Sequence, residues 1–427
     1  MDEIKMGTIQ NSHLHYVIFG FGVTGKSTYK YLKSIGFKVS VINSGDVESW
    51  RGEDAAVNDC FSQESSDALS VINSADFIVL SPGIPRDHHL LLEAQATLTN
   101  DIELFYQLKQ SSPKIVAITG SNGKTTTVTL LNEMLKNAGK SVFCGGNIGR
   151  SPMEYLLNGE KEEIVLLELS SFQLETIDQF SADFAAILNI QMTHEERYDD
   201  LKDYQAAKLR LFKNKKNGSK FFSDNMTHQL FKDSTIFDGA ENLKTLKKDY
   251  DLSSWAPPGL HNLLNLSLAT VIAAEVGTTQ EKIQETINTF PGVKNRIEYL
   301  GEYGPAKVYN DSKSTNLFSS DTAINSFKDK KVLLILGGQI RNKNALNFEM
   351  LKSVTQKCSR VILFGELSEM KEIKSDYIVR HLSHLHLDQV YNNEDVILFS
   401  PGFPSFDEFK NYVERGNCFR EIFSRAK

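Results

Sequence analysis

The chain alternates short apolar runs, rich in Val and Ile, with longer segments in which apolar residues recur at helical spacing. The apolar runs predict buried strands, and several end directly in turns containing Gly, Pro or Asn. The strands expected are 14–19, 37–42, 76–80, 115–118, 141–144, 164–167, 184–190, 307–309, 331–336, 360–364 and 395–399. The helices expected between them include 24–35, 128–137, 204–212 and 263–274. This alternation predicts an α/β protein built on parallel sheets.

The length of 427 residues suits about three domains, each large enough to bury its own core. A break is expected near Phe290-Pro291-Gly292. We predict an N-terminal Rossmann-like nucleotide-binding domain over residues 1–102 and a central domain with a P-loop ATPase-type parallel sheet over 103–292. A C-terminal Rossmann-like domain is predicted over 293–427.

The strongest local signal is the segment 115–127, where an apolar strand ends in a glycine turn that opens into a helix. Backbone amides and the positive helix end converge at such a junction, which suits a polyphosphate. Lys124 can reach the outer phosphates, and the Thr125 hydroxyl can join a magnesium shell. The loop is a relaxed form of the motif, because Ile118 stands where the first Gly belongs. The phosphate loop expected is Gly120, Ser121, Asn122, Gly123, Lys124, Thr125 and Thr126.

An earlier glycine loop in the chain, called here the first glycine loop, competes with this phosphate loop. Residues 20–27 satisfy both the strict P-loop pattern and the dinucleotide pattern G-x-G-x-x-G. A dinucleotide site needs a carboxylate after the second strand to bind the ribose, but Asn43 and Ser44 stand there and Asp46 comes late. We therefore expect this loop to receive another phosphate or ring, with a dinucleotide oxidoreductase as the alternative.

Polar residues follow the strands of the central segment. Glu168 ends a very apolar strand beside the phosphate loop, where a second protein ligand of nucleotide-bound magnesium belongs. Asn147 lies in the turn 145–149 after another strand. His194 follows the third strand, and Lys208 lies on the next helix. On spacing alone, Lys208 would be a helix-face lysine with a solvated head.

The composition narrows the class of protein. A net charge of -7 argues against a broad nucleic-acid surface. The four cysteines are widely spaced without a C-x-x-C pair, which predicts thiols in a reducing compartment. The first residues have no apolar leader, and no apolar run approaches about 18 residues. We expect a cytoplasmic monomer that acts on small molecules, without a nucleic-acid or membrane partner.

Taken together, these motifs resemble those of the Mur ligases of bacterial cell-wall synthesis. The resemblance covers nearly the full length, and its anchors come in the order of the family. The anchors are Gly20–Gly25, Ser81–Gly83, Asp101–Phe105, Thr119–Thr126, Gly145–Gly149, Glu168–Glu175, Ala206–Arg210, His261–Asn262, Asn310–Lys313, Thr315–Asn316 and Phe409–Asn417. The blocks at 168–175 and 310–313 are similar to the branch of the family that adds D-glutamate.

The resemblance implies an ATP-dependent, amide-forming ligase of three domains. ATP would phosphorylate the free carboxylate of UDP-N-acetylmuramoyl-L-alanine, and the amine of D-glutamate would displace phosphate from the acyl phosphate. The implied cofactors are ATP and Mg²⁺, with two metal ions and a carbamylated Lys208. Carbamylation would turn a repelling ammonium into an anion with oxygen ligands.

The resemblance also implies roles for individual residues. The implied catalytic residues are Lys124, His194 and Lys208, and the implied metal ligands are Thr125, Glu168, His194 and carbamylated Lys208. Adenine, γ-phosphate and ribose would contact Asn262, Arg296 and Asp311. The UDP precursor would contact Gly22, Thr24, Asn43, Ser44, Ser81, Asn147, Ser170 and Gln173. The incoming amino acid would contact Lys313, Thr315, Arg341, Ser405, Phe406 and Tyr412.

The chain departs from the family pattern at several positions. Thr193 precedes His194 where an Asp is usual, and Asn43 replaces an acidic residue. Arg341 aligns with an expected lysine, and Phe403-Pro404 replaces smaller residues, both in the expected amino-acid pocket. Two alternatives follow: a sister ligase that attaches another amino acid, such as L-glutamate, and a ligase-like protein that senses nucleotide or precursor without turnover.

Overall fold

A computed structural model describes residues 13–51, 59–92, 94–191, 197–198, 200–237, 239–340, 346–370 and 372–426. The chain divides into two compact units. The first comprises Met1–Asn242 and Leu268–Lys282, and the second comprises Leu243–Ser267 and Ile283–Lys427. The division passes through α10 (Gly239–Asp249), α11 (Leu260–Glu275) and α12 (Gln280–Thr289). The domain boundaries expected at residues 102 and 292 stay a prediction.

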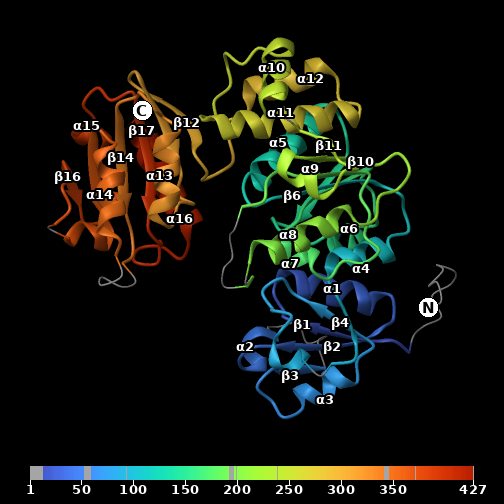
Figure 1. Ribbon diagram of the computed structural model, residues 1–427. Coiled ribbons are helices and arrows are strands. Elements are labelled where there is room, and N and C mark those ends of the chain that lie inside the picture. The colour runs from blue at the N-terminus through green and yellow to red at the C-terminus, as the bar shows by residue number, and fades with distance from the viewer. Residues whose placement is uncertain are drawn as a thin grey trace. The chain divides into compact units, whose positions relative to one another are not determined.

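The first sheet of the first unit has five parallel strands in the order β3-β2-β1-β4-β5 (Figure 1). Its strands are β1 (His15–Phe19), β2 (Lys38–Asn43), β3 (Cys60–Ser62), β4 (Phe77–Leu80) and β5 (Thr97–Thr99). The helices among them are α1 (Val23–Ser34), α2 (Val47–Arg51), α3 (Ala68–Asn73) and the 3-10 helix η1 (His89–Leu91). The strand order reverses direction beside β1, which is where open α/β sheets collect ligands.

The second sheet has six parallel strands in the order β11-β10-β9-β6-β8-β7. Its strands are β6 (Lys114–Thr119), β7 (Val142–Gly146), β8 (Ile164–Glu168), β9 (Phe184–Ile187), β10 (Lys220–Ser223) and β11 (Thr235–Ile236). The helices are α4 (Asp101–Leu108), α5 (Lys124–Asn137), α6 (Met153–Leu157), α7 (Ser171–Leu174), α8 (Leu201–Leu209), η2 (Arg210–Phe212) and α9 (Asn225–Leu230). The central strands β6 and β8 are fully or almost fully buried, as their continuous apolar runs require.

One cluster of buried side chains joins these two sheets. It includes Tyr16 of β1, Tyr29 of α1, Phe105 of α4, Phe143 of β7 and Tyr155 of α6. Helix α1 packs against α6 and α4. The cluster explains why the first two sheets form one compact unit, although the first sheet also has a separate cluster of buried side chains of its own.

The second unit contains a six-stranded sheet in the order β12-β13-β17-β14-β15-β16, with only β12 antiparallel among the described strands. Its strands are β12 (Glu298–Tyr303), β13 (Ala306–Asn310), β14 (Val332–Gly337), β15 (Arg360–Phe364), β16 (Tyr377–Val379) and β17 (Val396–Gly402). Its helices are α13 (Leu317–Asn325), α14 (Phe348–Gln356), η4 (Gly365–Glu369), η5 (Leu382–His384), α15 (Leu387–Val390) and α16 (Tyr412–Ala426).

The predicted α/β class with parallel sheets is confirmed, and most predicted elements lie within a few residues of their observed bounds. The strand predicted over 184–190 ends at Ile187, and the helix predicted from residue 128 begins at Lys124. The pattern missed β3, β5, β10, β11, β12 and β16. These strands are short or lie at sheet edges, so they lack a long apolar run.

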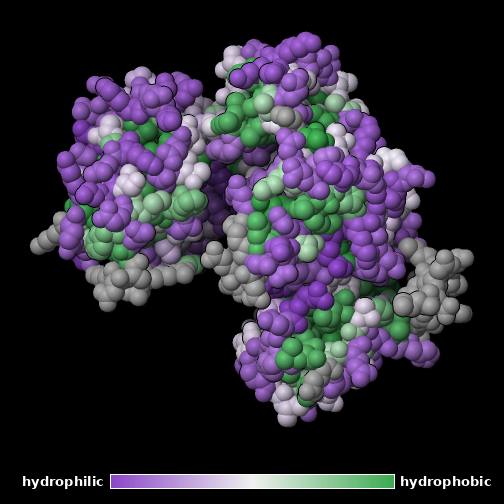
Figure 2. All heavy atoms as spheres, in the orientation of Figure 1, coloured by the Kyte–Doolittle hydropathy of each residue, from purple (hydrophilic) through white to green (hydrophobic). Residues whose placement is uncertain are grey.

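Hydrophilic residues cover most of the face shown in Figure 2, with smaller groups of hydrophobic residues between them. Such a mixture is ordinary for a folded protein. None of the helices in the described ranges is long and apolar enough to cross a membrane.

Candidate active site

The predicted phosphate loop joins the carboxyl end of β6 to the amino end of α5. Gly123 caps α5 with a φ of 85°, and Gly120 has a φ of 155°. A Cβ at Gly120 would lie 2.9 Å from the Cβ of Leu188, so the loop accepts no side chain there. The Lys124 ammonium donates to the carbonyl oxygens of Gly120 at 2.7 Å and Ser121 at 3.1 Å. The ammonium and the positive helix end thus meet at one place, as phosphate binding requires.

Residues after β9 brace this loop. The Asn189 carbonyl accepts from the Ser121 amide at 2.9 Å, and its side-chain oxygen accepts from the Asn122 amide at 3.0 Å. The Ser121 hydroxyl bonds the Gln191 carbonyl oxygen at 2.8 Å and the Tyr204 hydroxyl at 3.2 Å. Ser121 and Asn122 therefore help to hold the shape of the loop.

Lys208 is a buried amine against the same loop. Its residue is 1% exposed, and its ammonium donates to the Gly120 carbonyl at 3.1 Å and lies 4.5 Å from the centroid of the Tyr204 ring. Burial, and secondarily the charge of Lys124, lower the pKa of Lys208 to about 7. A large share of Lys208 is therefore a neutral amine near pH 7. The solvated helix lysine suggested by spacing alone is wrong.

We expect Lys208→Met to stabilise the ligand-free protein. The pKa of Lys208 is about 7 in the fold against 10.5 for a solvated lysine, so the protonated lysine opposes folding fully below pH 7 and progressively less up to pH 10.5. The gain at pH 6 should be on the order of 3 kcal/mol. Urea unfolding in CO₂-free buffer at acidic and at alkaline pH measures it. A larger gain at alkaline pH than at acidic pH would contradict the depressed pKa.

Glu168 ends β8, and its register partner on β6 is Ile118. The residue is 1% exposed, and one carboxylate oxygen accepts from the Asn147 side chain at 2.8 Å. The other, Oε2, is buried without a hydrogen-bond partner in the described part of the chain. Buried carboxylate oxygens are nearly always satisfied, so this oxygen suits a cation or a donor on a ligand.

The turn that carries Asn147 needs its glycines. A Cβ at Gly146, where φ is 100°, would lie 2.2 Å from the Glu168 carbonyl oxygen. A Cβ at Gly145 would lie 2.4 Å from the Arg150 carbonyl oxygen. The close approach places the Asn147 amide 2.7 Å from the Glu168 carbonyl oxygen, to which it donates. The turn therefore packs directly on the end of β8.

The predicted metal ligands are only partly described. Among the described residues, no group of three or more His, Cys, Asp or Glu side chains could hold a metal ion. His194 and Thr193 lie outside the described residues. Thr125, in the first turn of α5, and Glu168, at the end of β8, carry side-chain oxygens of the kind that magnesium prefers. Magnesium keeps several waters, so it does not need a cage of protein ligands.

The first glycine loop is shaped by packing. A Cβ at Gly25 would lie 2.2 Å from the Gly20 carbonyl oxygen, so this glycine lets α1 approach the end of β1. Among the described residues, no side chain caps α1 at Gly22, and a Cβ there would meet none of their atoms within 4 Å. The backbone at Gly22 is therefore open to a ligand.

Residues predicted for the UDP precursor surround this loop. The Asn43 side-chain oxygen accepts from a loop amide at 3.1 Å, and the Ser81 hydroxyl donates to a loop carbonyl at 2.8 Å. Thr24 is partly exposed in the first turn of α1, and Ser44 is exposed. Asn43 thus orders the loop with an amide oxygen where the dinucleotide pattern has a carboxylate.

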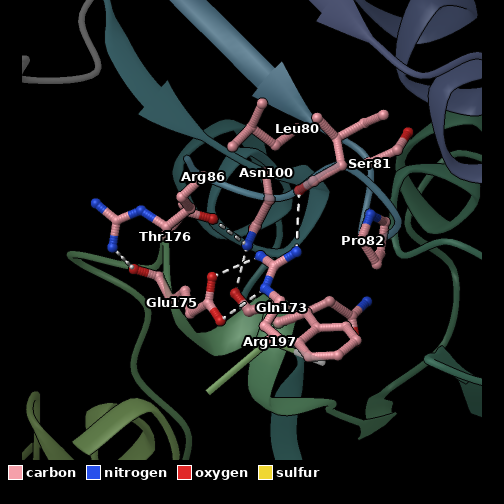
Figure 3. Close-up of a pocket in the computed structure, with 11 residues that line it drawn as sticks. Leu80, Ser81, Pro82, Arg86, Asn100, Gln173, Glu175, Thr176 and Arg197 are labelled. Carbon is pink, nitrogen blue, oxygen red and sulfur yellow. Dashed lines mark hydrogen bonds and ion pairs between the residues drawn. The ribbon is translucent and has the colours of Figure 1, made fainter. Parts of the chain in front are cut away.

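A small cleft lies between the loop after β4 and the segment around α7 (Figure 3). Ser170 and Gln173 form a capping box at α7, in which the Ser170 hydroxyl accepts from the Gln173 amide at 3.2 Å and the Gln173 side chain accepts from the Ser170 amide at 3.1 Å. The S-x-x-Q pattern could have predicted this cap. The cleft is lined by Leu80, Ser81, Pro82, Ile84, Arg86, Asn100, Phe172, Gln173, Glu175, Thr176 and Arg197.

The residues predicted to bind adenine and the γ-phosphate lie in the second unit, whereas the phosphate loop lies in the first. Asn262, in the first turn of α11, is buried and donates to the Pro258 carbonyl at 2.7 Å. Arg296 is exposed. The predicted ATP set is therefore divided between the two units.

Asp311, predicted to bind ribose, is buried after β13. Its carboxylate accepts from the Ile297 amide at 3.1 Å and from the hydroxyls of Ser314 and Ser400. Burial raises the pKa of Asp311 to about 6. The carboxylate already joins three chain segments, so a ribose hydroxyl would compete with these donors.

Residues predicted for the incoming amino acid lie on neighbouring loops of the second unit. The Lys313 ammonium lies 4.4 Å from the centroid of the Tyr412 ring, and burial lowers its pKa. Ser405 is buried, Thr315 is partly exposed, and Phe406 is 58% exposed. A cation, hydroxyls and aromatic rings are the groups that a dicarboxylate with an aliphatic stem can use.

Sequence reasoning missed Arg415, which joins these loops. This fully buried residue of α16 donates to the Ser312 hydroxyl at 3.1 Å and carbonyl at 2.9 Å, and to the Phe403 carbonyl at 2.8 Å. Burial lowers the pKa of Arg415 to about 10. The Phe403 side chain is buried in the core. Arg341 lies outside the described residues.

Two protein-family models match parts of the chain. The Mur ligase MurD-like N-terminal domain matches residues 14–103, and the Mur ligase middle domain matches residues 118–236. Among solved structures, the MurF ligase from Thermotoga maritima in complex with ADP has a TM-score of 0.56 at 16% identity and covers 97% of this chain and 96% of that one. At this identity the likeness shows a shared fold.

Similar proteins that carry the name UDP-N-acetylmuramoylalanine--D-glutamate ligase include one from Syntrophus aciditrophicus and one from Aquifex aeolicus. The protein from Syntrophus aciditrophicus is 32% identical over 446 residues, which cover 95% of this chain and 96% of the relative. The protein from Aquifex aeolicus is 32% identical over 434 residues, which cover 96% and 98%. Identity at this level from end to end, with the phosphate loop in place, shows that the chain belongs to the Mur ligase family.

Proposed function

We propose that this protein is an ATP-dependent ligase that joins D-glutamate to UDP-N-acetylmuramoyl-L-alanine through an acyl phosphate, in peptidoglycan precursor synthesis. The observation that carries the proposal is the nearly full-length similarity to the Syntrophus and Aquifex ligases of that name. The phosphate loop between β6 and α5 supports the use of ATP.

In the first step, a carboxylate oxygen of the alanyl group attacks the γ-phosphorus of ATP. The bond from that phosphorus to the β–γ bridging oxygen breaks, and ADP leaves. The step is needed because a free carboxylate is a poor electrophile, and the acyl phosphate carries a good leaving group. Lys124 and the start of α5 hold the phosphates. When ATP binds, the Lys124 ammonium donates to phosphate oxygens in place of the loop carbonyls to which it donates in this structure.

In the second step, the amine of D-glutamate attacks the acyl carbon. The amide bond forms, inorganic phosphate leaves with the bonding electrons, and the amine loses a proton. The proposed site for the incoming amino acid consists of Lys313, Thr315, Arg341, Ser405, Phe406 and Tyr412. The Lys313 ammonium over the Tyr412 ring supports binding of a carboxylate there.

Thr125 and Glu168 are proposed ligands of a first magnesium ion. The buried Oε2 of Glu168, which has no hydrogen-bond partner among the described residues, supports this assignment, since hard cations prefer carboxylate oxygen. Bound magnesium would neutralise phosphate charge and make the γ-phosphorus easier to attack. His194 and carbamylated Lys208 are the proposed ligands of a second ion.

The pKa of Lys208 supports carbamylation. Its neutral amine can add to CO₂, forming an N–C bond and releasing a proton, so that a carbamate anion replaces the ammonium. A pKa of about 7 makes that amine available near neutral pH, where an ordinary lysine is almost fully protonated.

The remaining assignments complete the proposal. The UDP precursor is bound by Gly22, Thr24, Asn43, Ser44, Ser81, Asn147, Ser170 and Gln173, and ATP by residues 120–126 with Asn262, Arg296 and Asp311. The three-domain division at residues 102 and 292 belongs to the same proposal. So does action as a monomer on small molecules in the cytoplasm.

The proposal is tested by ADP release from the purified protein with UDP-N-acetylmuramoyl-L-alanine, magnesium and ATP. We expect release that depends on D-glutamate and rises well above the rate without an amino acid. Turnover with L-glutamate instead would assign a sister ligase. Measurable ATP binding without ADP release for any precursor or amino acid would assign a sensor.

A further inference from the structure

We infer that Glu175 and Arg197 act together as positioning residues for the UDP precursor, by fixing the loop 81–86 of the first sheet against α7 of the second. The inference rests on the proposed function, since it concerns the precursor site of that ligase. Glu175 follows α7 and Arg197 follows β9 in the chain, so neither belongs to the first sheet that they anchor.

Several contacts fix the side chains of Glu175 and Arg197 in place (Figure 3). Arg197 donates to both carboxylate oxygens of Glu175, from Nε at 3.2 Å and from Nη2 at 2.6 Å. The Tyr198 hydroxyl donates to Glu175 Oε1 at 2.6 Å, and the guanidinium lies 4.5 Å from the centroid of the Phe172 ring. The side chains of Arg197 and Glu175 are 13% and 11% exposed. A bidentate pair of this kind is stronger and more specific in geometry than a surface ion pair.

Two hydrogen bonds cross from this pair to the loop after β4. The remaining Arg197 nitrogen, Nη1, donates to the Ile84 carbonyl at 3.3 Å. Arg86 Nη1 donates to the backbone carbonyl of Glu175 at 3.4 Å. The pair is therefore a junction of three segments, and one of them is the loop whose Ser81 bonds the first glycine loop.

This junction explains why a guanidinium is needed. Arg197 uses three nitrogens at once on two different segments, which a lysine with a single nitrogen cannot reproduce. The phosphate loop receives no bond from Glu175 or Arg197 among the contacts above. Loosening the pair should therefore move the precursor loop while leaving the ATP site in place.

The test compares Glu175→Gln and Arg197→Lys with the wild type. Glu175→Gln keeps the shape of the side chain and removes its negative charge. Arg197→Lys keeps the positive charge and removes the planar guanidinium with its three donating nitrogens. For both variants we expect the KM for UDP-N-acetylmuramoyl-L-alanine to rise about 10- to 100-fold, since a misplacement near 1 Å can have such an effect. The KM for ATP should change less than about twofold. The double variant should be no worse than the poorer single variant, because both changes break one junction.

Arg360→Lys is the matched control, because Arg360 pairs with the buried Glu394 at 3.3 Å in the second unit. It should leave every KM unchanged. Precursor affinity measured by calorimetry without ATP separates the proposed ligase activity from the proposed positioning role. If the wild type binds the precursor without turnover, the ligase activity is refuted. The ratio of precursor affinities between each variant and the wild type still tests the positioning role. An unchanged precursor KM and affinity in both variants, even with a lower unfolding midpoint, would show that the pair only stabilises the fold and overturn the inference. Absence of precursor binding by the wild type would overturn it as well.

Discussion

Replacing Lys208 by alanine is expected to abolish ligation, with a fall in kcat of at least about 1,000-fold. The variant lacks the amine that forms the carbamate, and so lacks the proposed oxygen ligand of the second magnesium. Added formate or acetate should partly restore activity, because each supplies a carboxylate to the space left by the side chain. The rate of ADP release, measured against formate concentration, tests this result.

The pH dependence of the wild type is the companion measurement. Carbamylation needs the neutral amine, so activity should fall as pH drops below about 7 and recover when CO₂ is raised. The formate-rescued variant should lack this dependence on CO₂. Near-normal activity of Lys208→Ala without any additive would refute the carbamate.

Lys124→Ala is expected to eliminate ATP-dependent product, with a loss of about 1,000-fold or more, because it removes the cation that reaches the outer phosphates. Lys26→Ala should leave ATP affinity nearly intact, although Lys26 occupies the matching position of the strict motif. The Lys26 ammonium lies 5.8 Å from the centroid of the Phe21 ring, in the loop assigned to the precursor. ATP affinity by calorimetry and ADP release by a coupled assay separate the two variants.

The opposite result for the two lysine variants would move the ATP site. If Lys26→Ala abolished ATP binding and Lys124→Ala left it intact, the nucleotide would belong to the first loop. The packing at Gly25 argues against this, because close contact between α1 and the end of β1 already accounts for that glycine.

The central strands and the phosphate loop were predictable because local rules determine them. The buried strands β6 and β8 read as continuous apolar runs, and the turn before α5 has glycine where φ is positive. Edge strands such as β12 were not predictable, since half-exposed residues carry no apolar run. The cluster of buried side chains that joins the first two sheets also has no local signal, because it depends on contacts between distant helices.

In the candidate site too, features set by the local sequence were predictable and features set by tertiary contacts were not. Glu168 was predictable as a carboxylate at the end of an apolar strand. That one of its oxygens has no partner in the described part of the chain depends on the tertiary fold. The burial of Lys208 and Arg415 was not predictable, because each lies on a helix whose pattern suggests a solvated cation. The capping role of Ser170 and Gln173 could have been predicted from their spacing.

Lys208 and Glu168 have one more consequence, which concerns protein engineering. Both side chains are buried in forms that an optimised fold would avoid: Lys208 is an amine with a strongly depressed pKa, and Glu168 is a carboxylate with one oxygen that lacks a partner within the described ranges. Apolar replacements at these positions should raise thermal stability, because they remove the free-energy cost of burying a charged or unpaired polar group. A library screened for heat resistance alone should therefore enrich substitutions at Lys208 and Glu168 that abolish ligase activity. Any such screen of this ligase needs activity as a simultaneous criterion.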